Sequence, residues 1–316
     1  MGPLRGITVL DLSRILAGPW ATQALADFGA QVIKIERPDT GDDTRSWGPP
    51  YLKGPDGRDT TESAYFASTN RGKQSVAVDF SRPEGQDIVR RLAARADIVV
   101  ENFKVGGLAR MGLAYTDLAP LNARLIYCSI SAFGQSGPAA AAPGYDAMIQ
   151  GMGGLMSVTG RPDEEPGGGP QKVGIAVSDL MAGMYALSAI LGALYEREQS
   201  GIGQYIDMAL LDAQIAWLAN QGLNYLASGR APTRHGNAHP NIVPYQSFVT
   251  RDGYLMLAVG NDRQFARFCE VAGRSGLPLD LVQSGDALAS VNTFVNRKHA
   301  RQLMWESGSQ RSRGKS

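Results

Sequence analysis

Short apolar runs that alternate with amphipathic segments constrain the fold more than any other feature of this chain. Runs of strand length stand at residues 7–12, 31–35, 75–78, 97–100 and 125–130. Segments with helical spacing stand between them, at residues 17–26 and 83–96. Continuous apolar strands separated by amphipathic helices are typical of a parallel sheet covered on both faces. We therefore predict an α/β fold whose large domain is a Rossmann-like, doubly wound parallel sheet.

The second half of the chain predicts a long helix at 177–198, a strand at 203–208, a helix at 210–227 and a hairpin of strands at 245–250 and 254–259. Around residue 229 the composition changes to Arg, Pro, His and Asn. We expect a large domain at residues 1–228 and a smaller, incomplete α+β domain at 229–305. The polar residues 306–316 predict a disordered tail.

The composition excludes several classes of protein. With 31 Lys and Arg against 30 Asp and Glu, the chain has no basic excess for binding nucleic acid. Two cysteines and three histidines predict neither a disulfide framework nor a metal site. Neither a membrane-spanning run nor a signal segment is visible in the sequence, so we expect a cytoplasmic protein without a membrane partner.

The loop after the first predicted strand argues against a nicotinamide cofactor. Residues 12–19 (LSRILAGP) contain one glycine, Gly18, where a dinucleotide fingerprint has three. Pro19 also removes an N–H donor from the position where a pyrophosphate would be bound. A dehydrogenase is therefore disfavoured.

Two arginines follow the carboxyl ends of predicted strands, where ligands bind in α/β folds. These are Arg37 and Arg110. A guanidinium group pairs with phosphate oxygens through two parallel hydrogen bonds, so both arginines suit the 3′-phospho-ADP part of coenzyme A (CoA). The alternative is that they are solvated surface charges.

A series of motifs in this order resembles the class III CoA-transferase family. The motifs are LDLSR with AGP (10–19), VIKIERP with GDDTR (32–45), NRGK (70–73), VENF (100–103), RMG (110–112), FGQSGP (133–138) and PGYD (143–146). The resemblance implies a Rossmann-like fold and CoA as substrate and product, with no permanently bound cofactor. It also implies contacts to CoA from Arg37, Asn102, Phe103, Arg110, Met111 and Tyr145. The segment HPNIVPYQ (239–246) is most similar to the branch that uses dicarboxylic acids such as succinate and glutarate.

The family's covalently modified aspartate corresponds to Asp179, in the segment GIAVSDL (174–180). The residues agree, because Asp179 begins a predicted long helix whose dipole favours an anion there. The alternative is an ordinary first-turn acid. The implied activity is an acyl-CoA:carboxylate CoA-transferase that works through an aspartyl mixed anhydride and an aspartyl–CoA thioester.

A dicarboxylic substrate also requires a cation for its free carboxylate. Arg14 is the first candidate and His239 the second, while a structural ion pair is the alternative for Arg14. Glycine-rich segments at 151–154 and 167–169 are candidates for the oxyanion donors, although the acidic residues beside 167–169 favour a surface loop there. Residues 236–239 (GNAH) occupy the region where some members of the family have a glycine-rich lid, but they depart from that pattern.

Two other interpretations stay open. The class III CoA-transferase family also includes acyl-CoA racemases, which have a histidine where this chain has Tyr145. Because tyrosine is a poor base near neutrality, a racemase is the less favoured interpretation. Members of the family are longer than this chain and form interlocked homodimers that their last segment closes. A truncated, non-catalytic CoA-binding remnant is therefore the second alternative.

Overall fold

A computed structural model describes residues 2–250 and 252–273. The chain forms two units. Unit 1 comprises the chain up to Ser157 together with Lys172–Pro232. Unit 2 comprises Val158–Gln171 and the chain from Thr233. The part of the predicted small domain that follows residue 273 lies outside the described residues, as does the whole of the predicted tail at 306–316.

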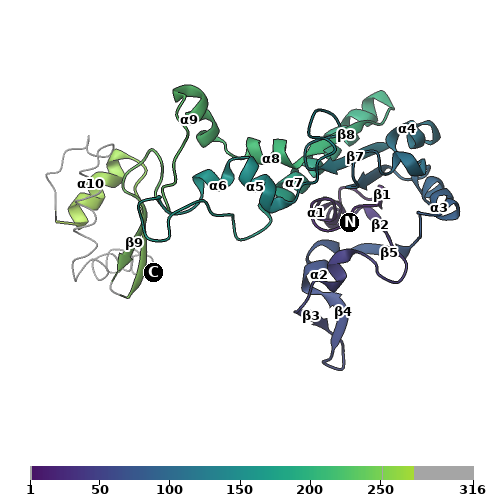
Figure 1. Ribbon diagram of the computed structural model, residues 1–316, viewed down its shortest axis with the longest axis horizontal. Coiled ribbons are helices and arrows are strands. Elements are labelled where there is room, and N and C mark those ends of the chain that lie inside the picture. The colour runs from purple at the N-terminus through teal and green to yellow at the C-terminus, as the bar shows by residue number, and fades with distance from the viewer. Residues whose placement is uncertain (1, 251, 274–316) are drawn as a thin grey trace, which may run out of the picture. The chain divides into compact units, whose positions relative to one another are not determined.

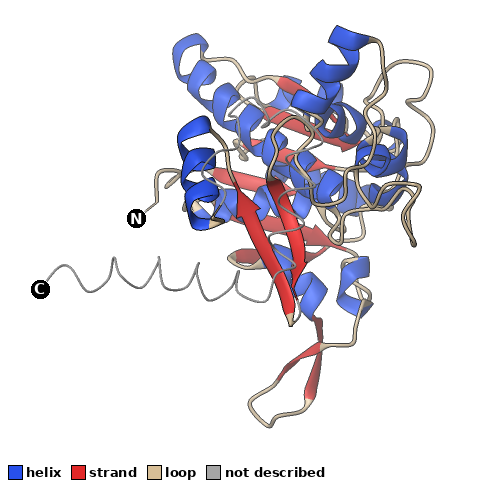
Figure 2. Cartoon of the chain, turned by 90° about the vertical axis from the view of Figure 1, so that its left-hand side faces the viewer, coloured by secondary structure: helices blue, strands red, loops and turns tan. Residues whose placement is uncertain are grey.

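Unit 1 is built on a six-stranded parallel sheet with the strand order β5-β2-β1-β6-β7-β8. Figure 2 draws the strands of the chain in red and its helices in blue. The strands are β1 (Thr8–Asp11), β2 (Gln31–Glu36), β5 (Lys73–Ala77), β6 (Ile98–Glu101), β7 (Ile126–Ser131) and β8 (Tyr205–Ala209). Its neighbouring first and second strands pair in register, with Val9 opposite Val32. The predicted α/β fold class is confirmed.

Helices cover both faces of this sheet, as the apolar strands require (Figure 1). One face is covered by α1 (Ala17–Asp27), α7 (Val177–Ser200) and α8 (Leu210–Ala216). These helices pack against the face of β1 on which the Val9 side chain lies. On the other face α3 (Pro83–Ala93) and α4 (Tyr115–Leu118) pack on Leu10. The alternation of Val9 and Leu10 between two cores follows from the two-residue period of a strand.

Helix α7 is long and apolar enough to cross a membrane by length and composition, with a mean hydropathy of 1.5. From the sequence we had expected no run of this length and hydropathy. Half of its apolar window is buried inside unit 1, which is typical of a core helix. Gly183 allows its close contact with α1, because a Cβ there would lie 2.6 Å from the carbonyl oxygen of Ala17. The apolar composition of α7 is thus explained by packing.

The structure differs from the sequence prediction at two places. The predicted helix at 210–227 is two helices, α8 and α9 (Asn220–Ser228), because Ala219 adopts a left-handed φ of 45° that ends the helical path. A hairpin of β3 (Tyr51–Lys53) and β4 (Asp59–Ser63) was not predicted, since its residues are mostly polar and exposed.

The other elements are short. In unit 1 they are the 3-10 helices η1 (Asp43–Ser46), η2 (Ala109–Met111) and η3 (Ala119–Leu121), and the helices α2 (Ala64–Asn70) and α5 (Asp146–Met152), with α6 (Leu155–Val158) at its edge. Unit 2 contains the predicted antiparallel hairpin, β9 (Tyr245–Thr250) with β10 (Gly253–Ala258), followed by α10 (Asp262–Val271).

Buried charges connect the central strand to the sheet edge. The carboxylate of Asp11 is fully buried and lies 3.0 Å from the Lys73 ammonium group. Burial alone would raise the pKa of Asp11, but Lys73, Lys34 and hydrogen bonds from Ser13 and Thr22 lower it to about 2. Burial lowers the pKa of Lys73 to about 8, although Asp11 opposes that shift. Lys73 also donates to the carbonyl of Pro19 at 2.9 Å. The ion pair therefore fixes the start of α1 against the strand ends.

We expect Lys73→Met to lower the free energy of unfolding by about 3 kcal/mol, because it leaves the buried Asp11 carboxylate without its nearest cation. Lys53→Met is the matched control, since the Lys53–Asp59 pair is exposed and its loss costs at most ~1 kcal/mol. Urea unfolding at pH 7 measures both. Equal losses in the two variants would contradict a special role for the buried pair.

Candidate active site

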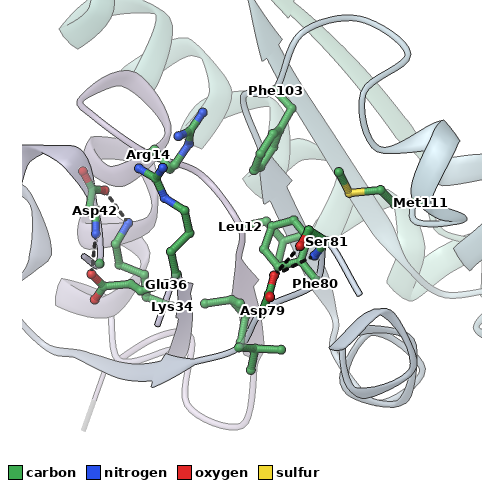
Figure 3. A pocket seen from close by; sticks show the side chains of 14 residues that line it. Leu12, Arg14, Lys34, Glu36, Asp42, Asp79, Phe80, Ser81, Phe103 and Met111 are labelled. Carbon is green, nitrogen blue, oxygen red and sulfur yellow. Dashed lines mark hydrogen bonds and ion pairs between the residues drawn. The ribbon is translucent and has the colours of Figure 1, made fainter. Parts of the chain in front are cut away.

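A cavity of about 210 Å³ lies at the carboxyl ends of β1, β2 and β6. Ligands bind at this edge of open parallel sheets. Figure 3 shows Lys34 and Asp42 on one side of the cavity and Phe80, Phe103 and Met111 on the other. Of the residues predicted to bind ligands, four line the cavity: Arg14, Arg37, Phe103 and Met111. The cavity therefore combines apolar walls with two guanidinium groups.

Arg14 is held by Asn102 and Phe103. The Asn102 side chain accepts a hydrogen bond from the Arg14 backbone N–H at 2.8 Å and donates to the Arg14 carbonyl at 2.7 Å. The Arg14 guanidinium carbon lies 5.0 Å from the centre of the Phe103 ring, within cation–π range. Two residues expected to contact CoA, Asn102 and Phe103, thus also position Arg14.

A second support comes from Asp42, whose carboxylate is buried. It pairs with the buried Lys34 ammonium group at 3.0 Å and accepts a hydrogen bond from the backbone N–H of Ile15 at 3.3 Å. Ile15 has a φ of 72°, a left-handed conformation that a β-branched residue rarely adopts. The Lys34–Asp42 pair therefore stabilises the strained turn that carries Arg14 into the cavity.

Arg14 and Arg37 are also joined by one carboxylate. Oδ2 of Asp43 lies 3.1 Å from Nη1 of Arg14, while Oδ1 of Asp43 accepts from Nη2 of Arg37. All three side chains are partly exposed. From the sequence we expected the two arginines to bind different parts of the substrate, whereas both line one cavity in the structure.

Asp179 lies in the first turn of α7 and is partly buried. The helix begins there through Asp146, whose carboxylate accepts from the backbone N–H of Ser178 at 2.8 Å and of Asp179 at 3.4 Å. Gln150 donates to the other Asp146 oxygen at 2.7 Å. On the opposite side, Ser178 Oγ donates to Gln214 at 2.8 Å. Asp179 thus stands on a backbone whose position is fixed from two sides.

The electrostatic environment keeps Asp179 easily protonated. Burial, and secondly the negative charge of Asp146, raise the pKa of Asp179 to about 7. Burial and the carboxylates of Asp179, Asp146 and Asp42 also raise the pKa of Tyr65. The Tyr65 hydroxyl is thus in an environment in which several carboxylates disfavour its ionisation.

The remaining predicted residues are more dispersed. Tyr145 precedes α5, directly before Asp146, and is 80% exposed. Arg110 is exposed in η2, next to Met111 of the cavity wall. His239 belongs to unit 2, where its ring lies 5.4 Å from that of Tyr245 and its Nδ1 accepts from the backbone N–H of Asn241.

The two glycine-rich segments and residues 236–239 are divided between the units. Residues 151–154 end α5 in unit 1, and residues 167–169 and 236–239 lie in unit 2. Gly153 has a structural role, because a Cβ there would lie 2.5 Å from Cγ of Gln214, the residue that holds Ser178. In the described part of the chain, no three His, Cys, Asp or Glu residues gather as metal ligands.

Sequence reasoning did not single out Lys34, Asp42, Asp43, Tyr65 or Asp146 as site residues. Asp42 and Asp43 stand inside the GDDTR motif, and Asp146 ends the PGYD motif, so a signal was present. Their functions depend on partners far along the chain, such as Ser178 for Asp146. Spacing along the sequence does not show such contacts.

Comparison with known proteins was made on sequence and on structure. The sequence model of CoA-transferase family III matches residues 4–307. A succinate–glutarate CoA-transferase of Agrobacterium fabrum is 57% identical over 86% of this chain and 66% of its own length. The human succinyl-CoA:glutarate CoA-transferase is 46% identical over 85% of this chain and 59% of its own length. The chain thus spans less than two thirds of the length of these relatives.

A solved structure shows the same fold. The crystal structure of a CAIB/BAIF family protein from Brucella suis has a TM-score of 0.83 and 48% identity, and the match covers 98% of this chain and 82% of that one. A crystal structure of Rv3272 from Mycobacterium tuberculosis has a TM-score of 0.80 and 30% identity, over 97% of this chain and 82% of that one.

The raised pKa of Asp179 predicts a pH-dependent gain of stability in Asp179→Asn. An aspartate has a pKa near 3.8 when exposed, against about 7 in the folded chain. Ionisation of Asp179 therefore destabilises the folded state, and this penalty develops from pH 4 to pH 7 and then levels off. We expect the advantage of the variant in free energy of unfolding to grow over that range, to on the order of 2 kcal/mol at pH 8.

Urea unfolding at several pH values measures this advantage. Asp87→Asn, on the exposed face of α3 beside Arg91, is the control and should show no such growth. A constant difference between Asp179→Asn and the parent chain from pH 4 to pH 8 would show that Asp179 is not held at an elevated pKa.

Proposed function

The chain belongs to CoA-transferase family III, and from that premise we propose that it transfers CoA between dicarboxylic acids of the succinate and glutarate type, with Asp179 as the nucleophile. The identity of 46–57% with relatives named for succinate and glutarate supports the substrate class. The position of Asp179 carries the mechanism. It is a partly buried carboxylate in the first turn of a long helix, beside a second carboxylate that helps to raise its pKa.

The proposed reaction begins when an Asp179 oxygen attacks the carbonyl carbon of an acyl-CoA. A C–O bond forms, the C–S bond breaks, and the products are an aspartyl mixed anhydride and the CoA thiolate. The thiolate then attacks the Asp179 carbonyl carbon. The anhydride C–O bond breaks, which releases the first acid as its carboxylate and leaves Asp179 as a CoA thioester.

An incoming carboxylate reverses these two steps. It attacks the Asp179 thioester, expels the thiolate and forms a new anhydride, and the thiolate then attacks the acyl carbon of the new acid. The new acyl-CoA leaves and the Asp179 carboxylate is regenerated. Because carboxylate and thiolate exchange in every step, the cycle balances without a proton donor or an oxidant.

The pKa of Asp179 fits this role. A nucleophilic carboxylate must be ionised, and near pH 7 about half of Asp179 is ionised at a pKa of about 7. A raised pKa also gives the carboxylate more basicity than an exposed aspartate has. Removal of water on substrate binding would strengthen the interactions within the site.

The CoA portion is proposed to bind at the cavity at the carboxyl ends of the strands. Arg37, Phe103 and Met111 line this cavity, and Asn102 forms hydrogen bonds with the backbone of Arg14 in the turn after β1. Arg110 is exposed in η2 next to Met111, and Tyr145 is exposed before α5; we propose that both contact CoA as well. We propose that the full-length form is cytoplasmic and acts as an interlocked homodimer, which the resemblance to the family implies.

We expect Asp179→Ala and Asp179→Asn to abolish transfer from succinyl-CoA to glutarate, while the Kd for CoA changes by no more than a few-fold. The reason is that each removes the nucleophile and leaves the cavity intact. Mass detection of glutaryl-CoA measures transfer, and calorimetry measures CoA binding. Hydroxylamine added with succinyl-CoA should modify Asp179 in the parent chain. Continued transfer by Asp179→Ala would refute the covalent mechanism.

We propose that Arg14 selects the free carboxylate of the dicarboxylic substrate. Arg14→Gln should then lower kcat/KM for succinyl-CoA and glutaryl-CoA by about a hundredfold, because a charge-assisted pair left unmade costs ~3 kcal/mol. Butyryl-CoA, which has no second carboxylate, is the matched substrate and should change little. If both kinds of acyl group decline together, Arg14 does not select the acyl group, and His239→Gln is the next variant for the same comparison.

A further inference from the structure

We propose that Asp43 is a positioning residue that holds Arg14 and Arg37 together as one clamp for an anionic group of the ligand. The anionic group is a phosphate of CoA or the free carboxylate of the acyl chain. The proposal deepens the proposed function, on which it rests for the identity of the ligand.

The first observation is the bridge itself. Each carboxylate oxygen of Asp43 accepts from a different arginine, Oδ2 from Arg14 and Oδ1 from Arg37. A guanidinium group has five N–H donors, and each arginine uses one nitrogen on Asp43. Both arginines also line the cavity. Their remaining donors are therefore available to a second anion on the cavity side.

The second observation is that the backbone of Asp43 is itself fixed. Asp43 begins η1, and the preceding Asp42 caps this helix by accepting from the backbone N–H of Thr44 at 3.0 Å and from its hydroxyl at 2.8 Å. The buried Lys34 ammonium group pairs with the same Asp42 carboxylate at 3.0 Å. Asp42 points inward to Lys34 while Asp43 points outward to the arginines, so two consecutive aspartates divide the structural and the positioning roles.

The third observation concerns the two arginines. They come from different parts of the sheet edge, Arg14 from the turn after β1 and Arg37 from the residue after β2. Arginine side chains have many rotamers, and each one that a ligand must order weakens binding. Asp43 orders both before the ligand arrives.

An alternative role for Asp43 has the opposite effect on binding. If Asp43 only neutralised the arginines, its carboxylate would repel the ligand's anion, and its removal would tighten binding. The side chain of Asp43 is 38% exposed, so water screens this repulsion. Its contacts with the guanidinium groups are direct, and we therefore expect the loss of positioning to dominate.

The test is Asp43→Asn, which preserves the shape of the side chain and removes its charge. Isothermal titration calorimetry at fixed ionic strength should show that the Kd rises about tenfold for the ligand that carries the clamped anion, which is CoA for a phosphate or glutarate for a carboxylate. Adenosine 3′,5′-bisphosphate carries phosphates and no acyl chain, while glutarate carries carboxylates and no phosphate. The probe whose binding weakens identifies the anion in the clamp. Asp27→Asn is the matched control, because Asp27 pairs with two nitrogens of the exposed Arg71 and should leave every Kd unchanged.

A double-mutant cycle separates positioning from a general effect on the fold. In an Arg14→Gln, Arg37→Gln background, Asp43→Asn should have no further effect on the Kd, since the groups that it positions are gone. Unchanged or tighter binding of all three ligands by Asp43→Asn overturns the proposal, as does an equal loss in both backgrounds. These measurements do not involve acyl transfer, so they can fail while Asp179 remains the nucleophile, and they can succeed if it is not.

Discussion

The buried ion pair of Lys34 with Asp42 stabilises the loops that line the cavity at the carboxyl ends of the strands. A charge in the interior is tolerated only with a partner and with its other hydrogen bonds satisfied, and Asp42 meets this condition with Lys34, Thr44 and the N–H of Ile15. The strained turn at Ile15 and the start of η1 are consequently fixed to each other. A cavity between two loops thereby gains walls of defined position, and Arg14 and Arg37 meet at one carboxylate, that of Asp43.

Around Asp179 a partly buried carboxylate lies beside another carboxylate, whereas Asp42 lies beside a cation. Here two carboxylates, Asp146 and Asp179, lie at the beginning of one helix, and Asp146 takes the backbone N–H groups that would otherwise stabilise the negative charge of Asp179. Because burial and Asp146 raise the pKa of Asp179, we expect the ionisation of Asp179 to destabilise the folded chain near neutral pH. A raised pKa also makes this carboxylate more basic than that of an exposed aspartate, which suits its proposed role as a nucleophile. A local loss of stability of this kind is common at active sites.

The fold of unit 1 could be predicted from the sequence because the apolar strands leave few alternatives. Four of its strands, β1, β2, β6 and β7, bury apolar side chains on both faces, and parallel strands need helical crossovers, so the α/β class follows. The hairpin at β3 and β4 could not be predicted, since polar, exposed residues provide no periodic signal. The division of the 210–227 segment into α8 and α9 was missed because Ala219 is an ordinary helix former whose left-handed backbone no local pattern indicates.

The candidate site divides in the same way. The sequence by itself was enough to predict Asp179, Arg14 and Arg37 as the residues of the proposed chemistry, because a motif is defined by residue type and spacing along the chain. Only the tertiary structure decided their partners: Asp146 comes from 33 residues before Asp179, and Asn102 comes from 88 residues after Arg14. Burial and Asp146 raise the pKa of Asp179, and Asn102 fixes the backbone of Arg14. The physical reason is that pKa values and side-chain orientation depend on burial and on neighbouring charges in space, which the order of residues does not specify.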